Sequence, residues 1–124
     1  MQIKSVFIVE DDPSLQSLYE KILSYYGYTI LGVARNGEEA VKMFVDFQLK
    51  PDIIIMDHRL PVKDGIEASK EILIYEKKAK ILFASADKTI KDAALSIGIT
   101  RFIEKPFDIS VLIENIKELI DVKI

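Results

Sequence analysis

Four short apolar runs in the sequence are each followed by side chains that could take part in ionic or phosphoryl chemistry. These side chains belong to Glu10, Asp11 and Asp12 after the first run, Asp57 after the second, Ser85 after the third and Lys105 after the fourth. Carboxylate oxygens are the ligands that a small hard cation such as Mg²⁺ prefers, and a carboxylate can also attack phosphorus as a nucleophile. A lysine and a hydroxyl beside it would neutralise the charge on a phosphoryl group in transfer. The residue types therefore favour a metal-assisted phosphoryl-transfer site.

Taken one at a time, these residues have simpler interpretations. An acidic residue before a helix is more often an N-cap than a ligand, and Asp12, next to Pro13, is interpreted as a cap. Ser85 alone would be a turn residue and Lys105 alone a solvated side chain. Their joint placement is harder to explain, because carboxylates held about 5 Å apart repel by about 3 kcal/mol per pair at an effective dielectric constant of 20. A bound cation is therefore expected where the carboxylates meet.

The segments that must position these groups alternate in periodicity along the whole chain. Runs rich in Ile, Val or Phe predict strands at 5–9, 29–34, 53–56, 80–84 and 101–104. Apolar spacing of three and four residues predicts helices at about 13–26, from 36 onward, and at about 66–77, 89–97 and 109–121. This alternation predicts an α/β fold, a doubly wound five-stranded parallel sheet with five helices covering both faces. In such sheets ligands bind beyond the carboxyl ends of the strands.

Capping residues and apolar stripes set the expected helix ends and buried faces. Asp12, Asn36 and Asp108 are the expected N-caps, and Gly27 should end the first helix. The side chains expected to face the core are Leu15, Leu18, Tyr19 and Ile22; Val41, Phe44 and Val45; Ile90, Ala93, Ala94 and Ile97; and Ile109, Leu112, Ile113, Ile116, Leu119 and Ile120.

Length and composition limit the protein to one ordinary domain. The 124 residues, 49% hydrophobic and 30% charged, predict a single packed unit over 1–124. The formal charge of −3 disfavours direct binding of nucleic acid. No apolar run approaches the roughly 18 residues of a membrane span, and the N-terminus lacks the features of a signal peptide. The absence of cysteine removes disulfides and thiolate chemistry and fits a cytoplasmic location.

Four motifs together give the sequence a resemblance to a known family. They are Phe7-Ile8-Val9-Glu10-Asp11-Asp12, Ile54-Ile55-Met56-Asp57-His58-Arg59-Leu60-Pro61 with Asp64-Gly65, Leu82-Phe83-Ala84-Ser85-Ala86, and Phe102-Ile103-Glu104-Lys105-Pro106-Phe107. Each motif alone is weak, but all four in order on the right strand ends are highly specific. From Val6 to about Ile120 the chain resembles the receiver domain of two-component response regulators, especially the chemotaxis type. The resemblance implies a flavodoxin-like fold with strand order 2-1-3-4-5.

The resemblance implies a phosphorylation site and a metal site at the same place. Asp57 takes the position of the phosphoacceptor and also belongs to the implied metal ligands. Asp11 takes that of a direct Mg²⁺ ligand, and Glu10 that of a second acidic group acting through water. Arg59 would add its backbone carbonyl as a further ligand. Glu10 stands where Asp is frequent, and its longer side chain leaves open whether Glu10 coordinates Mg²⁺ directly.

Further roles follow from the last two motifs. Ser85, in place of the frequent Thr, would supply the hydroxyl that contacts the phosphoryl group, and Lys105 would be its ion-pair partner. The bond from Lys105 to Pro106 would be a cis peptide. Phe102 takes the position of an aromatic switch that turns inward when Ser85 moves, although a plain core aromatic explains it equally well from the sequence.

Three charged or titratable neighbours need separate interpretation. His58 is the only histidine and invites a proton-transfer role, but the strand period should turn its side chain to the face opposite Asp57. Arg59 and Asp87 come two residues after Asp57 and Ser85. The family geometry implies that they flank the path of water to the phosphoryl group and act as a gate. Two unrelated loop charges are the simpler interpretation.

The implied function is a phosphorylation-activated signalling switch without turnover of a separate substrate. A histidine kinase or a histidine phosphotransfer protein would phosphorylate Asp57, and the change would alter a protein-binding surface on the fourth helix, fifth strand and fifth helix. Basic candidates expected to be exposed on that surface are Lys88, Lys91, Arg101 and Lys117. The chain is expected to act alone, as a monomer or a phosphorylation-dependent dimer, without contacting nucleic acid or membrane.

Three alternatives stay open. The chain could be the receiver domain of a longer transcription regulator or enzyme. It could be a metal-dependent phosphatase that works through an aspartyl phosphate, which is disfavoured because such hydrolases carry an acid–base Asp where this sequence has Arg59. A pseudo-receiver that is never phosphorylated conflicts with the full acidic, hydroxyl and lysine set.

Overall fold

A five-stranded parallel sheet in the order β2-β1-β3-β4-β5 forms the centre of the computed structural model, which describes residues 4–120. Its strands are β1 (Ser5–Val9), β2 (Thr29–Ala34), β3 (Ile53–Asp57), β4 (Ile81–Ser85) and β5 (Arg101–Glu104). Every pairing between neighbours is parallel. The predicted α/β fold and its strand order are confirmed.

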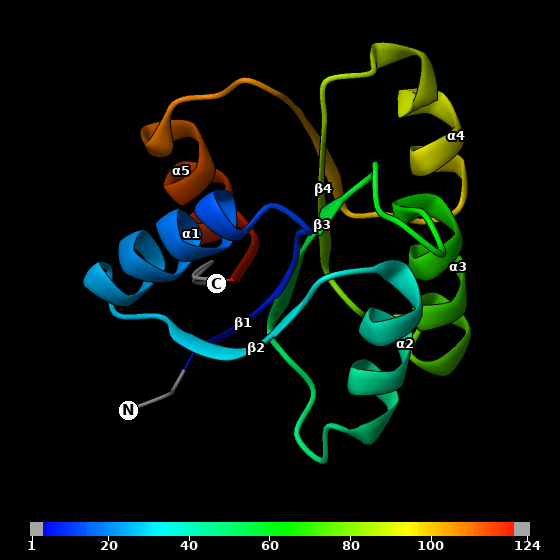
Figure 1. Ribbon diagram of the computed structural model, residues 1–124, viewed down its shortest axis with the longest axis horizontal. Helices are drawn as coiled ribbons and strands as arrows, with labels where there is room; N and C mark the ends of the chain where they lie inside the picture. Colours follow the sequence, from blue (N-terminus) through cyan, green and yellow to red (C-terminus); the bar gives the residue numbers. More distant parts are fainter. Residues whose placement is uncertain (1–3, 121–124) are drawn as a thin grey trace.

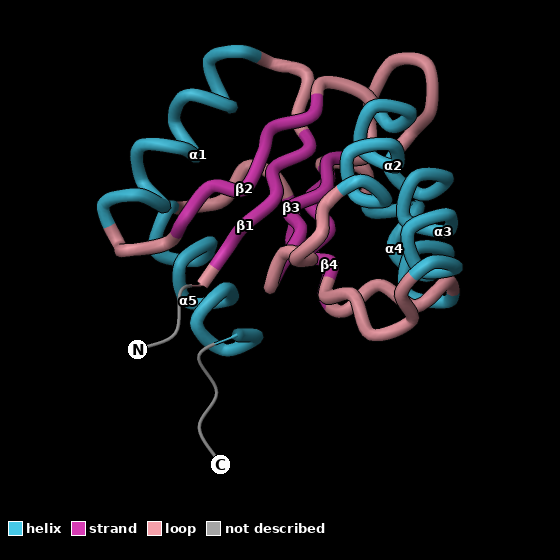
Figure 2. The backbone as a smooth tube through the Cα atoms, turned by 90° about the horizontal axis from the view of Figure 1, so that it is seen from below, coloured by secondary structure: helices cyan, strands magenta, loops and turns pink. Residues whose placement is uncertain are grey.

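Helices cover both faces of this sheet (Figure 1). On one face lie α1 (Pro13–Tyr25) and α5 (Ile109–Ile120); on the other lie α2 (Gly37–Asp46), α3 (Gly65–Tyr75) and α4 (Lys91–Ser96). Figure 2 shows the same layers from below. Within residues 4–120, every helix is too short or too polar to span a bilayer. Because the strands are parallel, their carboxyl ends share one edge of the sheet.

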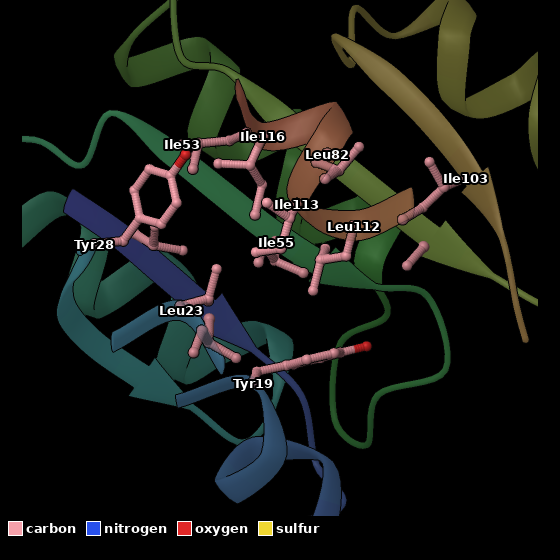
Figure 3. Close-up of a cluster of buried hydrophobic side chains, with 13 residues drawn as sticks. Tyr19, Leu23, Tyr28, Ile53, Ile55, Leu82, Ile103, Leu112, Ile113 and Ile116 are labelled. Carbon is pink, nitrogen blue, oxygen red and sulfur yellow. The ribbon is translucent and has the colours of Figure 1, made fainter. Parts of the chain in front are cut away.

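Two apolar cores result, since alternate residues of a strand point to opposite faces. The core beneath α1 and α5 holds Val6, Ile8, Leu23, Ile55 and Leu112 among others (Figure 3). The core beneath α2, α3 and α4 holds Phe7, Val9, Phe44, Met56 and Phe83 among others. The central strand β3 is buried along its whole length, which explains its unbroken apolar run.

The predicted helix ends are largely confirmed. The Asp12 side chain accepts a hydrogen bond from the Ser14 N–H at 2.9 Å, and Asn36 accepts one from the Glu39 N–H at 2.8 Å. Gly27, with φ of 90°, follows α1 in the left-handed conformation that favours glycine. At the start of α5 the backbone carbonyl of Asp108 receives N–H groups of the first turn. These local signals set the boundaries of the helices.

Several predicted boundaries are wrong by one or two residues. The first helix ends at Tyr25, and the third spans Gly65–Tyr75, with Asp64 as its N-cap. The fourth is divided into a 3₁₀ turn, Lys88–Ile90, followed by α4. Asp87 sets the start of the turn, because its side chain caps it by accepting the Thr89 N–H. The predicted end of the last helix at Asp121 lies outside the described residues.

Some residues of the predicted apolar stripes are exposed. Leu18 and Ile109 are each 43% exposed, and Val45 and Ala93 are also exposed. The physical reason is that Leu18 and Ile109 line an open pocket between α1 and the β5–α5 loop, and Val45 lines a groove between α2 and α3. In α1 the second fully buried position is Leu23, which the predicted stripe omits.

Candidate functional site

The carboxyl edge of the sheet brings the predicted polar residues together. Glu10 and Lys105 directly follow β1 and β5, whereas Asp57 and Ser85 are the last residues of β3 and β4. The prediction that Asp57 and Ser85 follow their strands is wrong by one residue, because both still pair with the neighbouring strand. Strand pairing therefore fixes their backbones, and a rigid sheet holds the side chains at this edge.

Three carboxylates meet at this edge around one lysine. Oxygens of Glu10, Asp11 and Asp57 all lie within 4.8 Å of one another. Lys105 Nζ donates to Asp57 Oδ1 at 2.8 Å and to Glu10 Oε1 at 3.2 Å. Glu10 is 2% exposed and Asp57 8%, while Asp11 is open to solvent. With one lysine facing three carboxylates, two negative charges remain uncompensated.

The shifted pKa values reflect this crowding. Burial raises the pKa of Glu10, and the charge of Asp57 raises it further, against the opposing effects of Lys105 and of the Asp12 N–H. Burial by itself would lower the pKa of Lys105, but its hydrogen bond to Asp57 and the surrounding negative charges outweigh burial and raise it. The lysine is therefore held in its charged form, and the cluster favours any additional positive charge.

The donor set fits a small divalent cation. Carboxylates with a backbone carbonyl and water are typical Mg²⁺ ligands, and the two uncompensated charges match the charge of the ion. Asp11 offers an exposed carboxylate, while Glu10 is already engaged by Lys105 and by the Asp12 N–H at 3.1 Å. Among the described residues no backbone N–H donates to the carbonyl of Arg59, so that oxygen is free to act as a ligand.

A cleft of about 510 Å³ opens over Asp57. It is lined by Asp57, Arg59, Ser85, Ala86, Asp87 and Lys105. Ser85 Oγ accepts a hydrogen bond from the Asp87 N–H at 3.0 Å, so its own proton remains available to a group in the cleft. Hydrogen bonds from Thr89 lower the pKa of Asp87, with a smaller effect from Arg59. Within the described chain Arg59 and Asp87 form no ion pair, although they share this cleft.

The loop after β3 is held tightly against Asp57. A Cβ on Gly65 would lie 2.2 Å from the Asp57 carbonyl oxygen, so only glycine allows α3 to begin this close to the phosphoacceptor candidate. In the same loop Val62 has φ of 70°, a left-handed conformation that is strained for a β-branched residue. The loop therefore combines a close backbone contact with a strained, exposed tip.

His58 and Phe102 both lie on the side of the sheet that carries α2, α3 and α4. The His58 ring is 5.9 Å from that of Phe83, and Phe83 stacks on Phe102 at 5.9 Å. Asp57 instead meets Lys105, so the prediction that His58 points away from Asp57 is confirmed. Phe102 is half-buried rather than enclosed. The peptide bond between Lys105 and Pro106 is cis, as predicted.

Two residues near the site were not predicted to belong to it. Tyr19, predicted only as a core residue, lines the pocket beside Lys105, and its hydroxyl points away from Leu23 (Figure 3). Burial raises the pKa of Tyr19 to about 12, opposed by Lys105 and supported by Glu10. The Gln16 side chain donates to the Glu10 carbonyl at 2.5 Å. No spacing in the sequence signals either contact, because both depend on how α1 packs.

Comparisons with known proteins agree with this geometry. The family model of the response regulator receiver domain matches residues 6–117 of this sequence. Chemotaxis protein CheY of Thermotoga maritima is 36% identical over 118 residues, which cover 94% of this chain and 97% of that protein.

Solved structures show the same fold. A chain of the CheX–CheY–BeF3–Mg²⁺ complex from Borrelia burgdorferi gives a TM-score of 0.89 at 28% identity, covering 97% of this chain and 90% of that chain. The receiver domain of the sensor histidine kinase PA1611 from Pseudomonas aeruginosa PAO1, with a magnesium ion coordinated in its active site cleft, gives 0.86 at 28% identity, covering 98% and 100%. Because the family model spans most of the chain, this protein belongs to the response regulator receiver domain family of two-component systems.

Proposed function

We propose that this chain is a signalling switch that accepts a phosphoryl group on Asp57, with Mg²⁺ as its cofactor. The observation that carries the proposal is the position of Lys105 Nζ, 2.8 Å from Asp57 and 3.2 Å from Glu10, among carboxylates drawn from two strands. A structural ion pair would need only one carboxylate. Here the excess of negative charge lies beside a solvent-accessible cleft, which suits a cation and a phosphoryl group.

In the proposed reaction Asp57 attacks the phosphorus of a phosphohistidine. The bond from a carboxylate oxygen to phosphorus forms while the bond from phosphorus to the imidazole nitrogen breaks. Lys105 stabilises the negative oxygens of the transferred group, and the Ser85 hydroxyl donates a hydrogen bond to one of them. Glu10, Asp11, Asp57 and the Arg59 carbonyl would hold Mg²⁺, which would supply further positive charge against the phosphoryl oxygens.

The donor is proposed to be a histidine kinase or a histidine phosphotransfer protein. An apolar pocket of about 330 Å³ lies beside Lys105, between α1 and the β5–α5 loop, and offers a docking area next to the cleft. Leu18 and Ile109, which line it, are partly exposed. This pocket supports the approach of a protein donor with apolar side chains.

The proposed output surface lies on α4, β5 and α5. Lys88, in the 3₁₀ turn before α4, and Lys91 are exposed there, as predicted. Lys117 is also exposed, but its ammonium lies 5.7 Å from the centre of the Tyr26 ring, on the side of α5 that faces α1. The prediction for Arg101 is wrong: it is half-buried, because its guanidinium donates to Asn115 at 3.0 Å and pairs with Glu118. We propose that a downstream protein, rather than nucleic acid, binds this surface. We also propose that the protein is a cytoplasmic single domain that is either a monomer or a dimer formed on phosphorylation.

The alternatives differ in what they predict. A phosphatase would turn over a small aryl phosphate, whereas the proposed switch would be labelled once per molecule. Arg59 disfavours the phosphatase, because it offers no acid–base carboxylate two residues after Asp57. A role as the receiver domain of a longer regulator leaves the chemistry at Asp57 unchanged.

Phosphorylation with a small donor tests the proposal. With Mg²⁺ and acetyl phosphate, the protein should gain one phosphoryl group that mass mapping places on Asp57. The variant Asp57→Asn should gain none, while Asp87→Asn, in the same cleft, should still be labelled. Labelling of Ser85 or His58, or repeated turnover, would contradict the proposal.

The lifetime of the phosphoryl group is proposed to depend on Arg59 and Asp87. Both line the cleft over Asp57, where a water must align with the bond to be broken. We expect Arg59→Ala and Asp87→Ala each to speed autodephosphorylation, and the double variant to add little to either single one. Unchanged decay rates, or fully additive effects, would indicate that Arg59 and Asp87 are two unrelated loop charges.

A further inference from the structure

Three aromatic rings from neighbouring strands form a stack beside the candidate site. The centroids of Phe83 and Phe102 lie 5.9 Å apart with their planes at 19°, and His58 lies 5.9 Å from Phe83 at 39°. His58 directly follows Asp57 at the end of β3, Phe83 is in the middle of β4, and Phe102 pairs in register with Phe83 from β5. The stack therefore links the strand of the phosphoacceptor to the edge strand of the output surface.

Phe83 is the fixed member of this stack. Its side chain is fully buried in the core beneath α2, α3 and α4, whereas Phe102 and His58 are half-buried. A ring enclosed on all sides cannot change place without opening a close-packed core, while a half-buried ring can. Phe102 therefore packs against a ring that keeps its place in the core.

His58 lies against Phe83 through packing at its buried edge. Its Nδ1 is buried and has no hydrogen-bond partner in the described part of the chain. Buried polar atoms are normally hydrogen-bonded, but this nitrogen is not. Packing, and no polar contact, therefore holds this edge of the ring. The backbone of His58 is anchored, because its carbonyl accepts the N–H groups of Leu60 and Gly65. The backbone of His58 is thus fixed, and its ring packs against Phe83 from the strand that carries Asp57.

We propose that Phe83 holds Phe102 in the resting conformation, with His58 supporting Phe83, and that this contact sets the balance between resting and activated states. The inference rests on the phosphorylation switch proposed above. In this proposal Phe102 leaves its stacking contact with Phe83 when it turns toward Ser85, the inward motion that the family resemblance implies. Ser85 lies two residues beyond Phe83 on the same side of β4. A weaker contact therefore populates the activated state more, and any ligand selective for that state binds more tightly.

Replacement of Phe83 by aliphatic residues tests this. The probe is beryllofluoride with Mg²⁺, and Phe102 is followed by ¹⁹F NMR of protein labelled with 4-fluorophenylalanine, its signal being assigned by its loss in Phe102→Leu. In Phe83→Leu and Phe83→Met we expect the apparent affinity for beryllofluoride to rise about three- to tenfold, the equivalent of one aromatic stack. The resting ¹⁹F signal should shift toward that of the activated wild type.

Matched variants separate this effect from a general loss of packing. Phe44→Leu removes an equally buried ring of the same core that is outside the stack, and its affinity should stay at the wild-type value. In a Phe102→Leu background, Phe83→Leu should no longer change the affinity. His58→Ala should shift the affinity in the same direction as Phe83→Leu but less, whereas His58→Phe, which keeps a ring, should not.

The outcomes distinguish this inference from the proposed function. The inference alone is overturned if the wild type responds to beryllofluoride but the Phe83 variants have the same affinity and the same resting ¹⁹F signal as the wild type. An equal gain in Phe44→Leu, or a gain that persists in the Phe102→Leu background, also overturns it. A wild type that neither binds beryllofluoride nor shifts the Phe102 signal overturns both.

Discussion

The two edges of the sheet use charged side chains in opposite ways. At the amino edge, charges meet backbone groups: Lys50 Nζ donates to the carbonyls of Phe44, Val45 and Phe47 at 2.6, 3.0 and 2.7 Å after the end of α2. At the carboxyl edge, charges meet one another, and the carboxylates exceed the one lysine that pairs with them.

This difference separates stability from function within one small domain. A cation at a helix C-terminus offsets the negative end of the helix dipole and satisfies free carbonyls, so the amino edge stabilises the fold. Like charges at the carboxyl edge repel and so destabilise the metal-free protein. The comparison predicts that removal of a charged side chain changes stability with opposite signs at the two edges.

The largest expected effect is a loss of stability from Gly65→Ala. The new Cβ would meet the Asp57 carbonyl at 2.2 Å, so β3 and α3 must separate, at a cost of about 3 kcal/mol in unfolding free energy. At the opposite edge Gly27→Ala meets no atom within 4 Å and carries only the strain of its φ of 90°, about 1–2 kcal/mol. Urea denaturation measures both. Equal losses would show that no close contact distinguishes Gly65.

Removing the cation of the amino edge should also destabilise the protein. Lys50→Met leaves three carbonyls without their donor and should lower the unfolding free energy by about 1–2 kcal/mol. Lys42→Met on the exposed side of α2 is the matched control and should stay within about 0.5 kcal/mol of wild type. Thermal denaturation at low salt measures the difference. If Lys50→Met lowered the unfolding free energy no more than the control does, the amino edge would have no stabilising role.

Removing a charge from the carboxyl edge should have the opposite sign. Asp57→Asn relieves repulsion with Glu10 and Asp11 but loses part of the Lys105 contact, so the metal-free protein should gain about 1 kcal/mol. Mg²⁺ at 100 times its dissociation constant should stabilise the wild type by about 2.7 kcal/mol, and the variant less at the same concentration.

A matched change at the other edge completes this test. Asp52 accepts hydrogen bonds from the Ser5 N–H at 2.7 Å and from the Ser5 hydroxyl. Asp52→Ala removes this acceptor and should therefore lower the melting temperature, while Asp57→Asn raises it without metal. A metal-free Asp57→Asn protein less stable than wild type would contradict the crowding argument.

A smaller gain is expected in the loop that carries the site. Val62 has φ of 70° and is 77% exposed, so Val62→Asn loses little packing and relieves backbone strain, raising the unfolding free energy by about 1 kcal/mol. Val45→Asn, in the regular backbone of α2, relieves no strain and loses the apolar contacts of a partly covered side chain, so it should lower the unfolding free energy instead. Chemical denaturation of the two variants provides the comparison, and a loss in Val62→Asn would show that the loop is unstrained.

The smallest effect appears only at high pH. Burial raises the pKa of Tyr19 to about 12, so the folded state favours the neutral phenol. Its contribution to stability is fully present below the unfolded pKa of about 10 and is lost as the pH rises from there toward 12. Ultraviolet absorbance titration should show a last step that disappears in Tyr19→Phe and persists in the exposed Tyr25→Phe. Loss of that step in both variants would exclude the assignment.

Local patterns in the sequence were sufficient for the elements and for most of the site. Strand periodicity placed His58 on the face opposite Asp57, and the caps Asp12 and Asn36 set the starts of helices, because these features depend on neighbours within a few residues. The strand order did not follow from periodicity and came only with the family resemblance. The parallel direction of the strands puts their carboxyl ends at one edge, and the order decides which of these ends are neighbours.

Contacts between distant elements were decided only by the tertiary structure. Lys105 pairs with Glu10 across 95 positions of sequence, and the phenol of Tyr19 reaches the site because α1 packs beside the β5–α5 loop. The same packing leaves Leu18 exposed over a pocket, although its helical spacing predicts burial. Periodicity fixes the face on which a side chain lies, but the partner it meets depends on how separate elements pack, and no local pattern encodes that.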